Sequence, residues 1–376
     1  MRVLKGLIKR TEIALKDVEI RLGGLFFDRP EPRTRPLDHA KIQRILLLRH
    51  DKLGDMAVTI PALETIKKNL PQVAIDILAS PRNVALVKND SRLDNVFLYC
   101  KRPFKDFATL REIRRRDYDL VLDMICHDSV TSVFLSQYLG RRCLRSALGK
   151  TRLGQFYHFH LPVDIALAEH MLDVTLKSLW PLGITPERFF PHAPLHFSAG
   201  TASRVDDIIR SLEARAGRPC KFAGVNISAG ASNRWWGEEN FAEFLRLFAQ
   251  SAPEYQALLL STPEDRDRAL RVCALSACDP LMAPPGLDIM TVAGVISRLD
   301  LLVTPDTSLT HIARNFEVPV VGLYSAHERN TAQWRPYGQK RGLVQGGHVD
   351  DIFDITAARA LEETLEMLKR IEHVAV

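Results

Sequence analysis

Residues 44–55 read Arg-Ile-Leu-Leu-Leu-Arg-His-Asp-Lys-Leu-Gly-Asp, and this stretch decides the fold class. The apolar run at 45–48 is typical of a short parallel strand that is buried on both faces. The polar residues after it predict a loop, and the segment 56–69 predicts a helix. A buried strand that leads through a polar loop into a helix is the repeating unit of α/β proteins with parallel sheets.

The same alternation continues along the chain in two series. The first series has predicted strands at 73–78, 96–99 and 119–124 and helices at 85–88, 107–116 and 169–180. The second has predicted strands at 222–227, 256–260, 300–303 and 318–323 and helices at 238–250, 264–274, 289–298 and 308–316. Since 376 residues exceed what one hydrophobic core usually serves, the two series predict two α/β domains.

The domain boundaries follow from the breaks in this pattern. Residues 1–40 precede the first strand, 41–185 form the N-terminal domain and 195–345 form the C-terminal domain. The proline-containing residues 185–200 are predicted to connect the two domains. A last helix is predicted within 350–376, and packing back on the N-terminal domain is one option for it.

Composition places the chain in an ordinary class. Hydrophobic residues make up 46% and charged residues 26%, which is usual for globular proteins. The six cysteines include no C-x-x-C pair, so we expect no cysteine metal site and a reducing compartment. Because no apolar run is long enough to span a membrane, we expect the protein in the cytoplasm.

The basic net charge of +6 is concentrated near the N-terminus. Residues 1–44 contain eleven Lys or Arg against six Asp or Glu, so the remainder is close to neutral in sum. A nucleic-acid partner is therefore not expected. Residues 2–22 predict a basic amphipathic helix, which either packs on its own protein or binds an anionic membrane surface together with the apolar residues 25–27. In the second case 2–27 attach the protein to the inner face of the cytoplasmic membrane.

The first candidate site is the loop that follows the strand at 45–48. Ligands of open α/β sheets bind at the carboxyl ends of the strands, which is where Arg49, Asp51, Gly54 and Asp55 lie. Asp55 at the start of a helix can serve as a general base, and Gly54 would let the loop approach another segment closely. Asp is also a common helix N-cap, so both interpretations of Asp55 stay open.

The second domain offers three more loops of this kind. In 226–236 small residues such as Ser228 would let backbone amides approach a phosphate, and Arg234 would supply positive charge. In 304–311 Thr307 and Ser308 leave free amides at a helix N-terminus, which can hold a diphosphate. Ordinary strand-to-helix turns would look the same.

Two residues of these loops can also have a purely structural role. The third loop adds a carboxylate. Asp306 can be a helix cap, and His311 can be a packed histidine. In 261–265 the carboxylate of Glu264 could hold ribose hydroxyls. All four loops lie at the carboxyl side of two sheets and together indicate an interdomain cleft.

Four segments, in this order, resemble glycosyltransferase family 9, the heptosyltransferases. They are R-x-D-x-x-G-D at 49–55 with Thr59-Ile60-Pro61-Ala62-Leu63, the Glu169-His170 helix ending in Leu182-Gly183-Ile184, the Ser228-Ala229-Gly230 loop ending in Arg234-Trp235, and Asp306-Thr307 with His311 and Val318-Pro319-Val320. The resemblance covers roughly residues 42–340.

This resemblance implies a GT-B fold, in which two Rossmann-like α/β domains face each other across a cleft. It implies an inverting reaction without a metal or other cofactor, an ADP-heptose-like donor bound mainly by the second domain, and a lipopolysaccharide or other glycan or glycolipid acceptor. A sugar-nucleotide epimerase of the same fold and a non-catalytic membrane-associated paralogue are the alternatives.

The resemblance also assigns residues. Asp55 matches the family's proposed base, and Arg234 stands where the family has a Lys or Arg on the donor phosphate. The donor-binding loop is matched by Asp306, Thr307, Leu309 and His311, and the acidic residue near the ribose by Glu264. The family usually has glycine at the position of Ser308, whose Cβ would crowd a phosphate at that amide.

Overall fold

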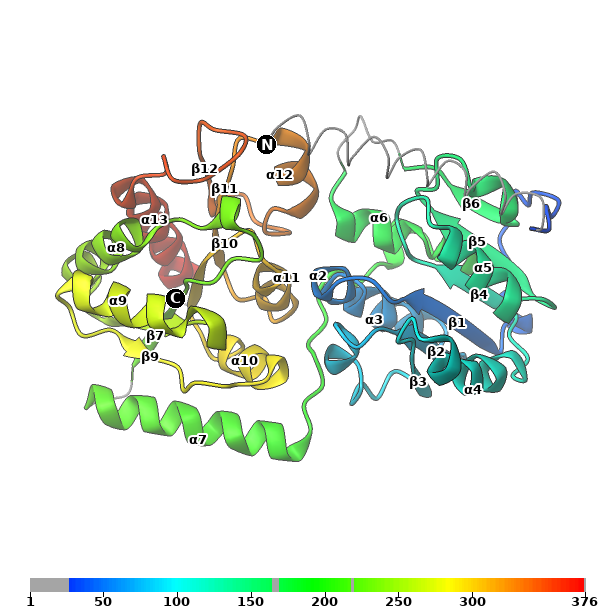
Figure 1. Cartoon of the computed structure of the whole chain (residues 1–376), viewed down its shortest axis with the longest axis horizontal. Coiled ribbons are helices and arrows are strands. Elements are labelled where there is room, and N and C mark those ends of the chain that lie inside the picture. Colours follow the sequence, from blue (N-terminus) through cyan, green and yellow to red (C-terminus); the bar gives the residue numbers. More distant parts are fainter. Residues whose placement is uncertain (1–26, 164–168, 218–219, 375–376) are drawn as a thin grey trace.

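The computed structural model describes residues 27–163, 169–217 and 220–374, which form two lobes (Figure 1). Its first described residues run along the N-terminal lobe: the amide of Arg33 donates to the carbonyl of His158 at 2.7 Å, and that of Leu37 to Pro181 at 2.9 Å. The proline-containing segment after residue 28 therefore belongs to this lobe. The amphipathic helix predicted over 2–22 lies outside the described residues.

The N-terminal lobe is built on one parallel sheet. Within the described residues its strand order is β3-β2-β1-β4-β5-β6, and β1 pairs with both β2 and β4. The chain leaves β1 in opposite directions to β2 and β4, and this switch point opens a crevice at the carboxyl ends of the strands. The strands are β1 (Arg44–Arg49), β2 (Ala74–Ala79), β3 (Asn95–Leu98), β4 (Leu120–Asp123), β5 (Leu144–Leu148) and β6 (Phe159–Leu161), and the helices are α2 (Leu53–Ala57), α3 (Ile60–Asn69), α4 (Pro103–Arg114), α5 (Val130–Leu139) and α6 (Met171–Lys177).

The C-terminal lobe repeats this plan. Its described strands follow the order β12-β11-β10-β7-β8-β9, with the switch point between β7 and β10. The strands are β7 (Lys221–Asn226), β8 (Tyr255–Leu260), β9 (Leu281–Met282), β10 (Leu301–Pro305), β11 (Val320–Tyr324) and β12 (Leu343–Gln345), and the helices are α7 (Ala199–Ala216), α8 (Glu238–Ser251), α9 (Arg266–Ser276), α10 (Ile289–Ile296), α11 (Ser308–Asn315), α12 (Glu328–Trp334) and α13 (Ala357–Val374). The predicted pair of Rossmann-like α/β domains is confirmed.

Several elements differ from the sequence-based prediction. The region 141–165, in which the sequence showed few regular signals and no strand was predicted, holds β5 and β6. Arg145 and Ser146 in β5 interrupt the apolar pattern that marks a buried strand. The predicted connection 185–200 leads directly into the long helix α7, which lies along the outside of the C-terminal lobe (Figure 1). The option that the last helix packs on the N-terminal domain is wrong, because Met367 and Leu368 of α13 pack with Phe241 and Phe244 in the C-terminal core.

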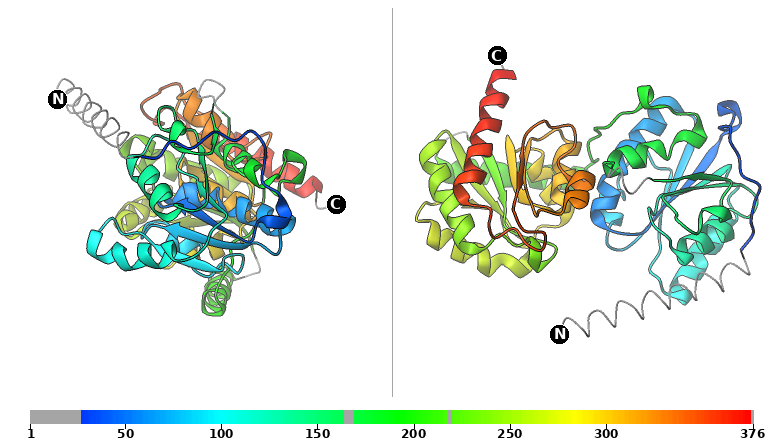
Figure 2. Two further views of the ribbon diagram at one scale, coloured as in Figure 1. Left: turned by 90° about the vertical axis from the view of Figure 1, so that its right-hand side faces the viewer. Right: turned by 90° about the horizontal axis from the view of Figure 1, so that it is seen from above.

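The two lobes meet at a packed seam, and Figure 2 shows them side by side from above. Helix α2 of one lobe packs on α11 of the other, and the Asn315 side-chain amide donates to the Ala57 carbonyl at 2.9 Å. Next to them, His170 donates from Nε2 to the Arg335 carbonyl at 2.8 Å. A single cluster of buried apolar side chains runs through both lobes. In the described part of the chain no helix is long and apolar enough to cross a membrane.

Candidate functional site

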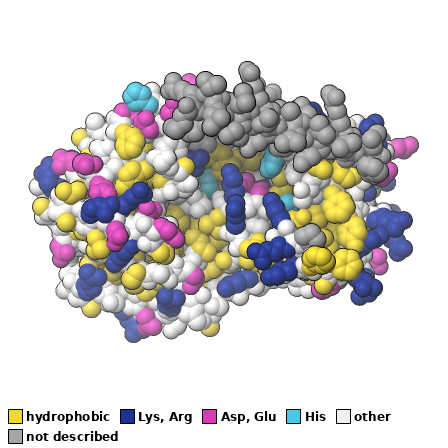
Figure 3. Space-filling model, in the orientation of Figure 1, with side chains coloured by type: hydrophobic (Ala, Val, Ile, Leu, Met, Phe, Trp, Pro, Cys, Tyr) yellow, Lys and Arg dark blue, Asp and Glu magenta, His cyan; other side chains and the backbone are white. Residues whose placement is uncertain are grey.

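A cleft of about 820 Å³ lies between the lobes, where both sheets have their switch points. The N-terminal lobe contributes the β1–α2 loop and residues 126–127 after β4, while the C-terminal lobe contributes the loops after β7, β8 and β10 together with α12. Figure 3 shows Lys and Arg side chains bordering the hollow between the lobes. The four loops singled out in the sequence therefore contribute to one cleft, which is the usual ligand address of open α/β sheets.

Asp55 lies in the first turn of α2 and lines this cleft. The N-cap of α2 is Lys52, whose side chain makes no capping bond, so the interpretation of Asp55 as the N-cap is wrong. Burial raises the pKa of Asp55, the Arg49 guanidinium opposes the rise, and the neighbouring Asp51 carboxylate adds to it. A carboxylate with a raised pKa is a stronger base at neutral pH.

Arg49 is wholly buried and lines no part of the cleft. Its Nε donates to the Thr59 hydroxyl at 2.8 Å, its Nη1 donates to the Met124 carbonyl, and Nη1 also contacts Asp51 at 3.3 Å. The Thr59 hydroxyl in turn donates to the Asp55 carbonyl at 2.9 Å. The prediction that Arg49 is a candidate residue of the acceptor side of the ligand site is therefore wrong. Arg49 instead holds the loop of Asp51 and Asp55 in position from its buried side.

Gly54 and Asp51 both line the cleft. The prediction that a glycine is needed at position 54 for a close approach to another segment is wrong. A Cβ added at Gly54 would lie 3.7 Å from His311 and 3.8 Å from the Ser308 Cβ, which are ordinary van der Waals distances. The backbone of Gly54 has no positive φ either. The close approach of α2 to α11 therefore does not require glycine at this position.

The loops after β7, β8 and β10 are tied together by hydrogen bonds. Asn226, the last residue of β7, donates from its side chain to the Ser228 carbonyl at 3.0 Å and to the Thr304 hydroxyl at 2.9 Å. The Ser228 hydroxyl accepts from the Thr262 amide at 2.9 Å. Ser228 thus fixes the spacing of two cleft loops. Asn226 was not among the predicted site residues, and its signal was a polar side chain at the end of a buried strand.

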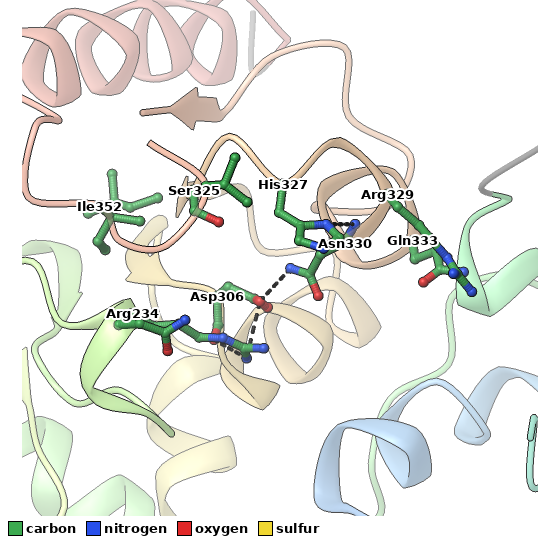
Figure 4. A pocket seen from close by; sticks show the side chains of 11 residues that line it. Arg234, Asp306, Ser325, His327, Arg329, Asn330, Gln333 and Ile352 are labelled. Atoms are coloured by element: carbon green, nitrogen blue, oxygen red, sulfur yellow. Dashed lines mark hydrogen bonds and ion pairs between the residues drawn. The ribbon is translucent and has the colours of Figure 1, made fainter. Parts of the chain in front are cut away.

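Arg234 and Asp306 form an ion pair on the C-terminal wall. The guanidinium lies 3.1 Å from Asp306 Oδ2 and also donates to the Asp306 carbonyl at 3.1 Å, while Asn330 of α12 donates to the same carboxylate at 2.9 Å (Figure 4). The Arg234 side chain remains 41% exposed. It is therefore oriented by its neighbours and still open to an anionic ligand.

Helix α11 begins at the cleft, with Thr307 as its N-cap and Ser308 as its first residue. The Thr307 hydroxyl accepts from the Leu309 amide at 3.3 Å, and Thr307, Ser308 and Leu309 all line the cleft. Ser308 has no positive φ, so serine is accommodated there without backbone strain. The Asp306 side chain is held by Arg234 and Asn330, so the simple helix-cap interpretation of Asp306 is wrong.

His311 is buried at the cleft wall, and Glu264 does not line the cleft. His311 is buried between Trp334 and His170, with ring centroids 5.3 and 6.3 Å away, and burial lowers its pKa to about 3. It is a neutral histidine packed at the α11 wall of the cleft. Glu264 belongs to the short 3-10 helix Pro263–Asp265, and its exposed side chain does not line the cleft, whereas the adjacent Thr262 and Pro263 do.

Comparison with known proteins identifies the family. Residues 107–351 match the family model described as glycosyltransferase family 9 (heptosyltransferase). The chain belongs to glycosyltransferase family 9. The resemblance stated from the sequence motifs is therefore confirmed, and the chain is a glycosyltransferase.

Individual members of the family are distant in sequence and similar in fold. Lipopolysaccharide heptosyltransferase 3 of Escherichia coli K12 is 22% identical over 295 residues, covering 76% of this chain and 82% of that protein. The family 9 glycosyltransferase structure from Veillonella parvula has a TM-score of 0.73 at 18% identity, covering 87% and 97% of the two chains. The E. coli heptosyltransferase WaaC with ADP has a TM-score of 0.65 at 17% identity, covering 88% and 99%. The two-domain GT-B fold is therefore shared.

In this family 9 enzyme most predicted site residues meet at the cleft. Asp55 faces it from one lobe, and Arg234 and Asp306 face it from the other. A second pocket of about 320 Å³ adjoins the cleft at Arg234 and Asp306 and continues toward Ser325 and Ile352 (Figure 4). The sequence prediction missed its α12 wall, which includes Asn330 and Gln333, because this helix was not recognised.

Proposed function

We propose that this family 9 glycosyltransferase moves a heptose or a related sugar from an ADP-heptose-like nucleotide diphosphate donor to a lipopolysaccharide or other cell-surface glycan acceptor. The proposal includes inversion at the anomeric carbon and no metal ion. It is supported by relatives whose names are lipopolysaccharide heptosyltransferases and by the similar fold of an ADP-bound heptosyltransferase. The observation that carries it is the placement of Asp55 opposite Arg234 and the start of α11 in one cleft.

On the acceptor side, Asp55 takes the proton from the acceptor hydroxyl. The hydroxyl oxygen then forms a bond to the anomeric carbon on the face opposite the diphosphate, and the bond from that carbon to the diphosphate oxygen breaks. Burial raises the pKa of the Asp55 carboxyl, which strengthens it as a base, while the nearby cations Arg49 and Lys52 favour its ionised form.

On the donor side, negative charge develops on the leaving diphosphate. Arg234 is oriented by Asp306 and exposed to the cleft, so it can pair with a phosphate oxygen. The amides at the start of α11 can donate to another oxygen at the positive end of the helix. Together these groups would stabilise the charge of the leaving diphosphate, which a metal ion stabilises in other transferases.

Replacement of Asp55 by Asn tests the proposal. We expect the transfer rate to fall about 10²- to 10⁴-fold, because the amide cannot accept the proton, with nucleotide affinity unchanged. Transfer is measured by release of nucleoside diphosphate, the anomeric configuration of the product by NMR, and metal independence by turnover in EDTA. Asp51→Asn is the matched control, since Asp51 lines the same wall. Near-normal turnover of Asp55→Asn, or retention of configuration, would contradict the mechanism.

A further inference from the structure

Helix α4 presents large apolar side chains to solvent. Its inward face buries Asp106 and Ile113, whereas Phe104 is 99% exposed and Phe107 is 61% exposed on the opposite face. Surface helices normally turn their apolar side chains toward the core. Two neighbouring exposed phenylalanines on one helix therefore indicate a surface that contacts something other than water.

Helix α5 extends this surface. Phe134 is half-exposed and stacks on Tyr138 with ring centroids 5.7 Å apart, and the Arg114 guanidinium of α4 lies 4.6 Å from the Tyr138 ring. This cation–π contact joins the two helices into one face. We call Phe104, Phe107 and Phe134, together with the Lys and Arg residues of 101–116, the α4–α5 patch.

The α4–α5 patch is strongly basic. Residues 101–116 contain seven Lys or Arg and two acidic residues, in a chain whose net charge is +6. Asp106 is buried and accepts from backbone amides, and Glu112 is bound to Arg116 at 3.1 Å. Across the described ranges the other exposed cations form no ion pair; they are Lys101, Arg102, Lys105, Arg111, Arg114 and Arg115. The net charge of residues 45–376 is close to zero because acidic residues elsewhere balance this cluster. The basic cluster was therefore not apparent from the net charge.

The α4–α5 patch belongs to the lobe that carries Asp55, and α4 begins at the carboxyl edge of its sheet. Helix α4 follows β3 at the carboxyl edge of the sheet, and β1 ends at the same edge. Burial lowers the pKa of His50, which immediately precedes the Asp51–Asp55 loop, and the nearby Lys101 ammonium lowers it further. Figure 3 shows hydrophobic and basic side chains side by side on this lobe, beside the hollow.

We propose that the α4–α5 patch docks on an anionic lipid membrane, with Phe104 and Phe107 entering the boundary between headgroups and acyl chains and the basic side chains contacting lipid phosphates. Apolar insertion combined with a basic cluster gives the two signals that stable peripheral binding needs. A second copy of the chain fits less well, because a two-fold contact would bring two surfaces of the same positive charge together. The docking does not depend on the reaction proposed above.

Vesicle flotation of the full-length chain tests this docking. We expect binding to vesicles that contain phosphatidylglycerol and little binding to neutral phosphatidylcholine vesicles, with loss of binding at high salt. The double variant Phe104→Ala/Phe107→Ala should bind at least about tenfold more weakly, and Arg111→Ala and Arg115→Ala about fivefold each. The matched control is Leu270→Ala/Leu275→Ala, which truncates two half-exposed apolar side chains on α9 and should bind like the wild type.

Each other outcome would overturn the docking. Wild-type protein that stays with the unbound fraction would do so directly. Equal binding by Phe104→Ala/Phe107→Ala would assign the contact to other residues, such as 1–26. A wild-type dimer that this double variant dissociates, seen by sedimentation, would assign the patch to a second copy. Thermal unfolding with and without ADP checks that every variant is folded, and flotation needs neither donor nor acceptor, so its result is independent of the proposed reaction.

Discussion

The buried ion pair between Lys150 and Asp123 supports one wall of the cleft and gives a strong prediction. Lys150 Nζ lies 2.9 Å from Asp123 Oδ2, and both side chains are 0% exposed. The ammonium also donates to the Ile125 carbonyl at 2.7 Å and to the His127 carbonyl at 3.1 Å. It therefore holds the segment after β4 that lines the cleft.

Lys150→Met keeps a side chain of similar length and removes the charge. The Asp123 carboxylate would keep the Tyr157 hydroxyl at 2.5 Å and the Ile125 amide at 3.0 Å, but it would lose its counter-ion in a fully buried site. Breaking a buried pair in this way costs about 3–5 kcal/mol. We expect this loss in the free energy of unfolding, measured by urea denaturation at neutral pH. The double variant Lys150→Met/Asp123→Asn should lose less, because it removes both charges.

The pH dependence gives a second measurement of the same pair. Burial alone would raise the pKa of Asp123, but the Lys150 ammonium and the Tyr157 hydroxyl outweigh it and hold the pKa below its usual value. A lowered folded-state pKa contributes stability above the unfolded pKa of about 3.9, and this stability is lost as the pH falls toward the folded value. Without Lys150 burial raises the pKa of Asp123, so the difference between wild type and Lys150→Met should begin to shrink above about pH 4 and keep shrinking as the pH falls toward the lowered pKa of the wild type. A cost under about 1 kcal/mol at neutral pH would refute the reasoning.

Three further predictions concern the cleft. Arg234→Ala should weaken ADP binding about 10- to 100-fold by calorimetry, and Arg234→Lys should lose less, because a charge-assisted contact is removed or only altered. The acid limb of kcat/KM should lie above the ordinary range of aspartate, since burial raises the pKa of Asp55 and the base must be deprotonated to act; a limb at the ordinary value would contradict this. Ser308→Gly should lower the unfolding free energy by about 0.5–1 kcal/mol without tightening ADP binding, because residue 308 has no positive φ.

The sequence predicted those parts of the fold that rest on uninterrupted apolar runs. Buried strands such as β1, β7 and β10 at the sheet centres carry such runs, so the two domains and the switch-point loops could be placed from them. Strand β6 has only three residues at a sheet edge, and β5 carries a buried arginine, so neither had this signal. Edge strands depend on their neighbours more than on their own pattern.

The candidate site divides in the same way. Asp55, Arg234 and Asp306 could be predicted because each follows a recognisable strand. The burial of Arg49 could not, since the Met124 carbonyl that accepts its hydrogen bond lies 75 residues away in sequence. The α12 residue Asn330 was not predicted for a similar reason. Its partner Asp306 belongs to another loop, and nothing in the local sequence marks the contact.

The cleft is lined from both lobes, so the spacing between Asp55 and Arg234 depends on the seam between α2 and α11. That spacing is fixed by buried contacts, including the Asn315 to Ala57 hydrogen bond and the packed His311. Burial lowers the pKa of His311 to about 3 and also lowers the pKa of His170. His311 therefore stays neutral above about pH 3, on the side where the raised pKa of Asp55 lies. A change of activity on the acid limb should accordingly report the proton on Asp55 rather than a charge on His311 at the seam.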